Sequence, residues 1–189
     1  MSNRFIVVAV VFACLAALAS CGSNPQVPRP RGYFRISFPE KEYKQYDAEC
    51  PFKFCIPTYS FLIKEQTDCW FNVYFPSYKA TIYMTYRGIN GDIDTLLNDA
   101  HDFAYKHTIK ADAIEERIFV NDSARVFGCM YDIKGNVASP LQFFVTDSTD
   151  NFMRGSLYFD ARPNKDSLAP VVDFIRGDVV HFIETFEWK

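Results

Sequence analysis

The chain has 189 residues and a formal net charge of −3, and it is 49% hydrophobic and 17% aromatic. The length suits one compact domain, and the aromatic content excludes a disordered chain, which could not carry so much apolar surface. The 20 Lys and Arg are outnumbered by 23 Asp and Glu. No basic excess is therefore present for a phosphate backbone, and nucleic acid is not expected as a partner.

The N-terminus has the pattern of a secretory signal. Arg4 precedes an apolar run over 5–18 that is too short for a comfortable membrane span. The run ends in Leu-Ala-Ser-Cys at 18–21, which resembles the lipobox of bacterial lipoproteins. We therefore expect residues 1–20 to be a lipoprotein signal peptide and Cys21 to carry the lipid. An ordinary secretory signal with an incidental cysteine is the alternative.

Several acyl chains on Cys21, palmitate among them, would anchor the protein, since each buried CH₂ contributes about 0.8 kcal/mol. Gly22 rather than Asp follows the cysteine. By resemblance to lipoprotein sorting, this predicts the outer membrane, with the domain facing the periplasm. Residues 21–31 contain three prolines and predict a semi-extended tether with a reach of roughly 30 Å.

Alternating apolar residues indicate strands in the rest of the chain. They occur at 34–38, 52–56, 71–75, 82–86, 118–120, 127–133, 141–145 and 157–159. Turn signals such as Asn-Gly-Asp at 90–92 and Lys-Gly-Asn at 134–136 separate them. Short links between successive strands predict antiparallel hairpins.

Two segments have helical spacing instead, over 93–107 and 168–186. Asp92 is the expected cap of the first helix, and Asp166 or Ser167 that of the second. The order of strands, helix, four strands and helix predicts an α+β domain over 32–189, with an antiparallel sheet covered by two amphipathic helices. At the level of topology, this order is similar to the PsbP/Mog1 type of α-β-α sandwich.

Four cysteines remain beyond the signal segment, in a compartment where thiols pair. Cys50 and Cys69 flank one short hairpin and are the favoured disulfide. Cys55 and Cys129 form a possible second pair. A buried free thiol is an equal alternative for Cys129, because it lies on the apolar face of its strand.

No catalytic or metal-binding pattern stands out. His101 and His107 are six residues apart and diverge on a helix, while His181 and Glu184 share a face but need further ligands. The chain has none of the common nucleophile, zinc or phosphate-loop motifs. We therefore expect a non-enzyme with no catalytic residues, no metal and no cofactor.

Seven segments of the sequence, taken together in their order, resemble the gliding motility lipoprotein GldD family. They are PRGYFRI (30–36), FPEKEY (38–43), CWFNV (69–73), YKHTIKADAI (105–114), ASPLQFFVTDST (138–149), RGSLYF (154–159) and HFIETFEWK (181–189). The resemblance implies a role in gliding motility and in type IX protein secretion across the outer membrane. It also implies other envelope proteins of that machinery as partners, and lipidation of Cys21.

Two surfaces are candidates for binding. Phe174, Val180 and His181 lie off the apolar stripe of the last helix and could meet a partner protein, or belong to a second packing layer against Trp188 or the N-terminal segment. The rival function is binding of a small ligand or envelope glycan through Trp70, Tyr74 and Tyr83. A deep aromatic pocket would favour the ligand, and a flat patch a protein partner.

Overall fold

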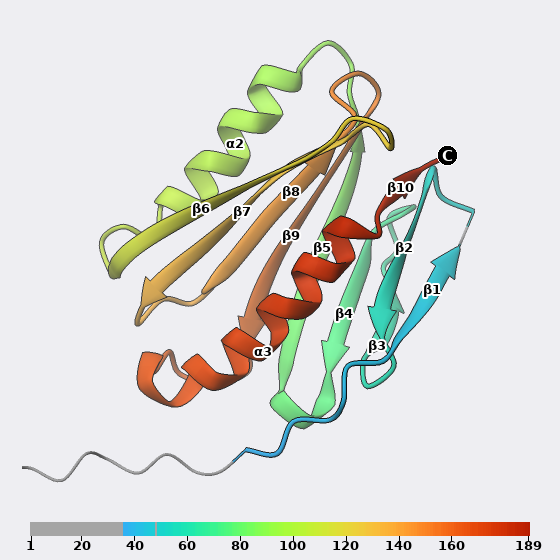
Figure 1. Ribbon diagram of the computed structural model, residues 1–189. Coiled ribbons are helices and arrows are strands. Elements are labelled where there is room, and N and C mark those ends of the chain that lie inside the picture. Colours follow the sequence, from blue (N-terminus) through green and yellow to red (C-terminus); the bar gives the residue numbers. More distant parts are fainter. Residues whose placement is uncertain (1–35, 48) are drawn as a thin grey trace, which may run out of the picture. The chain divides into compact units, whose positions relative to one another are not determined.

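The computed structural model describes residues 36–47 and 49–189 (Figure 1). The predicted signal peptide, Cys21 and the tether lie outside the described residues. Two antiparallel sheets and two α-helices make up the described part. A mostly antiparallel β structure with two helices agrees with the predicted α+β class, whereas the PsbP/Mog1-like arrangement stays a prediction.

The larger sheet has seven strands in the order β3-β4-β5-β9-β8-β7-β6. Every neighbouring pair is antiparallel, as the short links predict. A 3-10 turn at Pro76–Tyr78 joins β4 to β5. The strands are β3 (Phe61–Lys64), β4 (Phe71–Phe75), β5 (Ala80–Gly88), β6 (Ala111–Asn121), β7 (Val126–Gly135), β8 (Leu141–Thr146) and β9 (Asn151–Phe159).

The smaller sheet contains β1 (Tyr43–Asp47), β2 (Phe52–Pro57) and β10 (Glu187–Trp188) in the order β1-β2-β10. Its central strand is β2, which pairs with β1 along its whole length and with the last two strand residues of the chain. Strand β1 and the segment after α3 are thus brought to one strand.

Helices α2 (Ile93–Tyr105) and α3 (Lys165–Glu184) pack on opposite faces of the large sheet. Successive side chains of β8 point to opposite faces of the sheet. Phe143 therefore packs in the core beneath α3, whereas Phe144 packs against the residues of α2. Asp92 is the N-cap residue of α2, as predicted, but its side chain does not cap the helix, and the cap of α3 differs from the prediction. Asp92 makes no side-chain bond to its helix and accepts from Asn90 N–H instead. For α3 the cap is Asn164, whose side chain accepts from the backbone N–H of Ser167.

The main core lies between α3, the small sheet and the inner face of the large sheet. Phe54 and Phe182 meet there with ring centroids 4.8 Å apart, and Phe143 lies 5.4 Å from Phe182. Gly155 makes room for Phe143, because a Cβ at residue 155 would approach that ring to 2.3 Å. An aromatic core of this kind agrees with the high phenylalanine content.

The prediction of a strand over 34–38 is wrong for its described part. Ile36 and Phe38 have no regular structure, because the segment crosses α3 through side-chain contacts instead of pairing with a strand. Strands β1, β3 and β10 were not predicted from the sequence. Their residues are exposed or half-buried, so alternation along them is weak. The four strands between the helices are confirmed.

Candidate functional site

A buried carboxylate in the middle of α3 organises the densest polar cluster around that helix. The Asp178 side chain is 2% exposed. Its Oδ1 accepts from Lys41 Nζ at 2.5 Å, from Tyr43 OH at 3.0 Å and from Tyr59 OH at 2.8 Å. Lys41 Nζ also donates to the carbonyl oxygen of Phe174 at 2.8 Å. We call these residues, Lys41, Tyr43, Tyr59 and Asp178, the Asp178 cluster.

The electrostatics of the Asp178 cluster are those of a structural site. Burial, and then the nearby Asp178 carboxylate, raise the pKa of Tyr43 and of Tyr59 well above the usual range. Both phenols therefore stay protonated and act as donors. A cavity of about 20 Å³ beside Asp178 and Cys55 has room for about one water molecule, so it is too small for a substrate.

The candidate partner surface on α3 is covered in part by the chain itself. Phe38 stacks on Phe174 with ring centroids 4.5 Å apart, and Lys41 Nζ lies 4.2 Å from the centre of the same ring. Tyr43 stacks on His181 at 3.6 Å. Val180 is half-buried against the main core. These contacts are of the kind that the packing-layer alternative predicts, and residues 38–43 supply the covering side chains.

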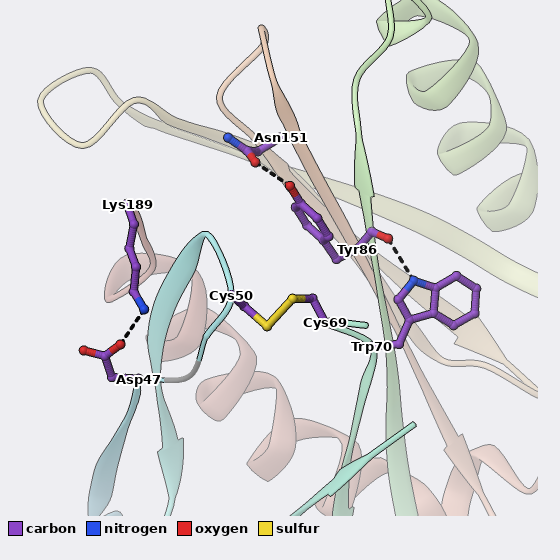
Figure 2. The surroundings of a disulfide bond; sticks show 7 residues. All are labelled: Asp47, Cys50, Cys69, Trp70, Tyr86, Asn151 and Lys189. Atoms are coloured by element: carbon purple, nitrogen blue, oxygen red, sulfur yellow. Dashed lines mark hydrogen bonds and ion pairs between the residues drawn. A yellow bond between two sulfur atoms is a disulfide. The ribbon is translucent and has the colours of Figure 1, made fainter. Parts of the chain in front are cut away.

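Cys50 and Cys69 form a disulfide, with their Cα atoms 5.7 Å apart (Figure 2). It joins the residues before β2 to those before β4, and so links the small sheet to the large one. Cys55 and Cys129 are free thiols in the structure. Cys129 is therefore the buried free thiol of the second alternative and does not form a disulfide with Cys55. Burial raises the pKa of the Cys129 thiol to about 11.

The disulfide is surrounded by side chains that fix the ends of the strands. Trp70 Nε1 donates to the carbonyl oxygen of Tyr86 at 2.8 Å, and Tyr86 OH donates to Asn151 Oδ1 at 2.6 Å (Figure 2). On the other side Lys189 Nζ pairs with Asp47 Oδ1 at 2.5 Å. These contacts join β1, β4, β5, β9 and the C-terminus around one covalent link.

The three aromatic residues of the rival ligand site lie on one open face of the large sheet. Asn72, between Trp70 and Tyr74, pairs in register with Tyr83 of β5. These residues line neither the cavity beside Asp178 nor the larger groove of about 520 Å³ between the β6–β7 turn and the end of α3. The three residues thus lie on a sheet face outside both pockets, which by the criterion above favours a protein partner over an enclosed ligand.

The histidines lie apart in the structure. His101 is exposed and stacks on Tyr105 at 4.1 Å, while His107 is half-buried and burial lowers its pKa. Within residues 36–47 and 49–189, no group of three or more His, Cys, Asp or Glu side chains is placed to hold a metal ion. Across the same residues, no helix is both long and apolar enough to cross a membrane.

Sequence reasoning missed the Asp178 cluster. One signal was available, because Asp178 interrupts the apolar stripe of α3 next to Val179 and Phe182. A carboxylate at such a position needs a cation or several donors. Its partners lie on a segment more than 100 residues away, and the sequence pattern gives no means of naming them.

The described residues thus define a disulfide-linked, mostly antiparallel β protein with two helices, whose N-terminal segment is held on α3. The sequence model of the gliding motility lipoprotein GldD family matches residues 23–188. The chain belongs to this family, as the quoted segments predict. A search of curated proteins finds no match. Family membership makes this a lipoprotein associated with gliding motility, and hence with the cell envelope.

Proposed function

We propose that the protein is a non-catalytic accessory or assembly component of the gliding and type IX secretion machinery. It is anchored by lipid on Cys21 in the outer membrane and faces the periplasm. Membership of the GldD family carries this proposal, and the lipobox at 18–21 supplies the residue for the anchor. The lipid provides localisation, the tether provides reach, and the folded domain provides surfaces for other envelope proteins.

The polar clusters of the described residues support a structural role. Three carboxylates are buried there, Asp132, Asp147 and Asp178, and each is held by donors of its own fold. Asp132 Oδ2 pairs with Lys134 at 2.5 Å and with Arg176 at 2.7 Å. Removing one partner of such a group destabilises a fold, because it leaves a buried charge uncompensated.

The anchor is tested by labelling cells with radioactive palmitate. The wild-type chain and the Cys14→Ala variant should incorporate label, because residue 14 lies inside the predicted signal peptide. The Cys21→Ala variant should incorporate none. Label in Cys21→Ala, or an unlabelled wild-type chain, would contradict the proposed anchor.

The role as an assembly component is tested by crosslinking in envelopes, followed by recovery of the acylated protein. We expect other envelope proteins of the gliding and secretion machinery to be crosslinked to it. Recovery of the uncrosslinked protein alone, from cells that are secreting actively, would contradict that role.

A further inference from the structure

One face of the large sheet is open over β3, β4 and β5 and carries several of the most exposed apolar side chains of the described residues. Helix α2 covers this face over β6, β7, β8 and β9, through Phe144 and its neighbours. Phe61 is 61% exposed, and Ile63, Tyr83 and Tyr158 are also exposed. We call Phe61, Ile63, Trp70, Tyr74, Tyr83 and Tyr158 the open aromatic face.

Strand register places these side chains together. Phe61 pairs with Tyr74, which pairs with Thr81, which in turn pairs with Tyr158. One row further, Ile63 pairs with Asn72 and Asn72 with Tyr83. Residues directly opposite one another on neighbouring strands point to the same face, so five of the side chains form one continuous surface. Trp70, two residues before Asn72 in an extended chain, adds to its end. The Tyr83 and Tyr158 rings meet edge to face at 5.8 Å.

The chemistry of the open aromatic face is that of a membrane–water interface. On β3, on β4 and on β5 as far as Thr85, its outward positions are apolar, aromatic, hydroxyl or amide side chains, and Arg87 follows at the end of β5. The nearest charged groups lie at its margins, where Glu65 accepts from Asn72 and Arg154 lies over Phe103 of α2. Tyrosine and tryptophan favour the interface because their apolar rings carry a polar end that stays hydrated.

The point where the chain enters the domain puts a bilayer within reach. Phe38 lies 5.8 Å from Tyr78, in the turn between β4 and β5, and Thr81 follows three residues later. From Cys21 to Ile36 the chain extends at most about 45 Å at 3.1 Å per residue. A domain held so closely meets the bilayer at a high effective concentration, so a surface of low intrinsic affinity suffices for contact.

We propose that the open aromatic face lies on the bilayer to which Cys21 is anchored. This inference rests on the proposed lipid anchor and adds an orientation to it: α3 and its covering segment are turned away from the membrane. A flat face of this kind also suits a protein partner. The bilayer is favoured because the six side chains of the open aromatic face are all uncharged, and because the tether keeps lipid permanently close.

Trp70 makes the proposal measurable, because it lies on this face (Figure 2). The other tryptophan, Trp188, packs against Phe186 at 4.6 Å in the main core, so Trp188→Phe leaves one reporter. The acylated protein is placed in phosphatidylethanolamine–phosphatidylglycerol vesicles with brominated acyl chains. We expect Trp70 fluorescence to fall about twofold relative to unbrominated vesicles.

Matched variants distinguish contact through the open aromatic face from nonspecific adsorption of the protein to the vesicles. Phe61→Ser with Ile63→Ser and Tyr83→Ser should abolish the quenching. Ile118→Ser with Val120→Ser should leave it unchanged, since these residues are at least as exposed but lie on β6 at the far edge of the sheet. Intact mass determines whether Cys21 is acylated, and circular dichroism determines whether each variant is folded.

The outcomes are distinct. A protein without acyl mass contradicts the proposed anchor and not the face. An acylated, folded protein whose Trp70 is not quenched overturns the orientation, and so does equal quenching in the variant that lacks the aromatic side chains. If a photocrosslinker at residue 83 captures a protein in envelopes while Trp70 stays unquenched in vesicles, the face binds that protein and the bilayer proposal falls.

Discussion

Lys41 Nζ lies 2.5 Å from Asp178 Oδ1, although the two residues are 137 positions apart in the chain. The lysine side chain is 36% exposed, whereas the aspartate side chain is 2% exposed. The pair joins the segment that follows the tether to α3.

Replacing Lys41 with Ala should lower the free energy of unfolding by about 1–2 kcal/mol, since a buried carboxylate loses its charged donor but keeps two phenols. Urea denaturation of the mature chain measures this change. The matched control is Lys53→Ala, which removes the more exposed pair with Glu187 at 2.7 Å and should cost less than about 1 kcal/mol. Equal losses in the two variants would contradict the importance of the Lys41–Asp178 pair.

Phe174→Ala should release the segment 36–42 from α3 while the sheets stay folded, because the rings of Phe38, Tyr59 and Tyr78 pack on that phenylalanine. Limited trypsin digestion should then cut after Lys41 faster than in the wild-type chain. Phe103→Ala on α2 is the control, as it removes an exposed phenylalanine and should leave the rate of this cut unchanged. Equal rates in wild type and Phe174→Ala would refute the covering role.

Opening the Cys50–Cys69 disulfide by Cys50→Ser with Cys69→Ser should destabilise the protein by about 3 kcal/mol, the value for closing a short loop in the unfolded chain. The two sheets lose their covalent link, so the melting temperature should fall. Cys55→Ser serves as the control because this thiol is free. If reducing agent left the melting temperature of the wild type unchanged, the bond would contribute nothing to stability.

Acid sensitivity should depend on Asp147 in the β8–β9 turn. Burial alone would raise the pKa of this carboxyl, but the Asn151 side chain and the backbone N–H groups of Asn151, Thr149 and Asp150 lower it below its usual value. A lowered pKa means that the carboxylate stabilises the fold above about pH 4, and that this contribution is lost as the pH falls further.

Asp147→Asn should therefore lower the melting temperature at pH 7 and reduce the further drop between pH 7 and pH 3. The exposed neighbour Asp150 supplies the control, and Asp150→Asn should retain the wild-type drop. If the melting temperature of Asp147→Asn fell between pH 7 and pH 3 by as much as that of the wild type, protonation of Asp147 would not contribute to the acid sensitivity.

The pattern of the sequence was sufficient for the strongly alternating strands and for both helices. Phe71, Val73 and Phe75 alternate with outward residues and form β4, and the apolar stripe over 168–186 forms α3. The same pattern did not predict β3, where Phe61 and Ile63 are both exposed. Apolar side chains on an open face do not show the contrast between buried and exposed positions from which a strand is recognised.

The candidate site was less predictable than the fold. Phe174 and His181 were recognised as lying off the buried stripe, yet their covering residues, Phe38 and Tyr43, come from the other end of the chain. Periodicity is a local signal and reports which face of a helix is polar. It does not report which distant segment packs there, and so the Asp178 cluster became visible only in three dimensions.

The central claim is that a lipid on Cys21 makes this domain part of the gliding and secretion machinery. Its most direct test is complementation of a strain that lacks the gene, with colony spreading and secretion of type IX cargo as the readout. We expect Cys14→Ala to restore both activities, and Cys21→Ala to restore neither although the folded domain is exported. Full spreading and secretion with Cys21→Ala would contradict the claim.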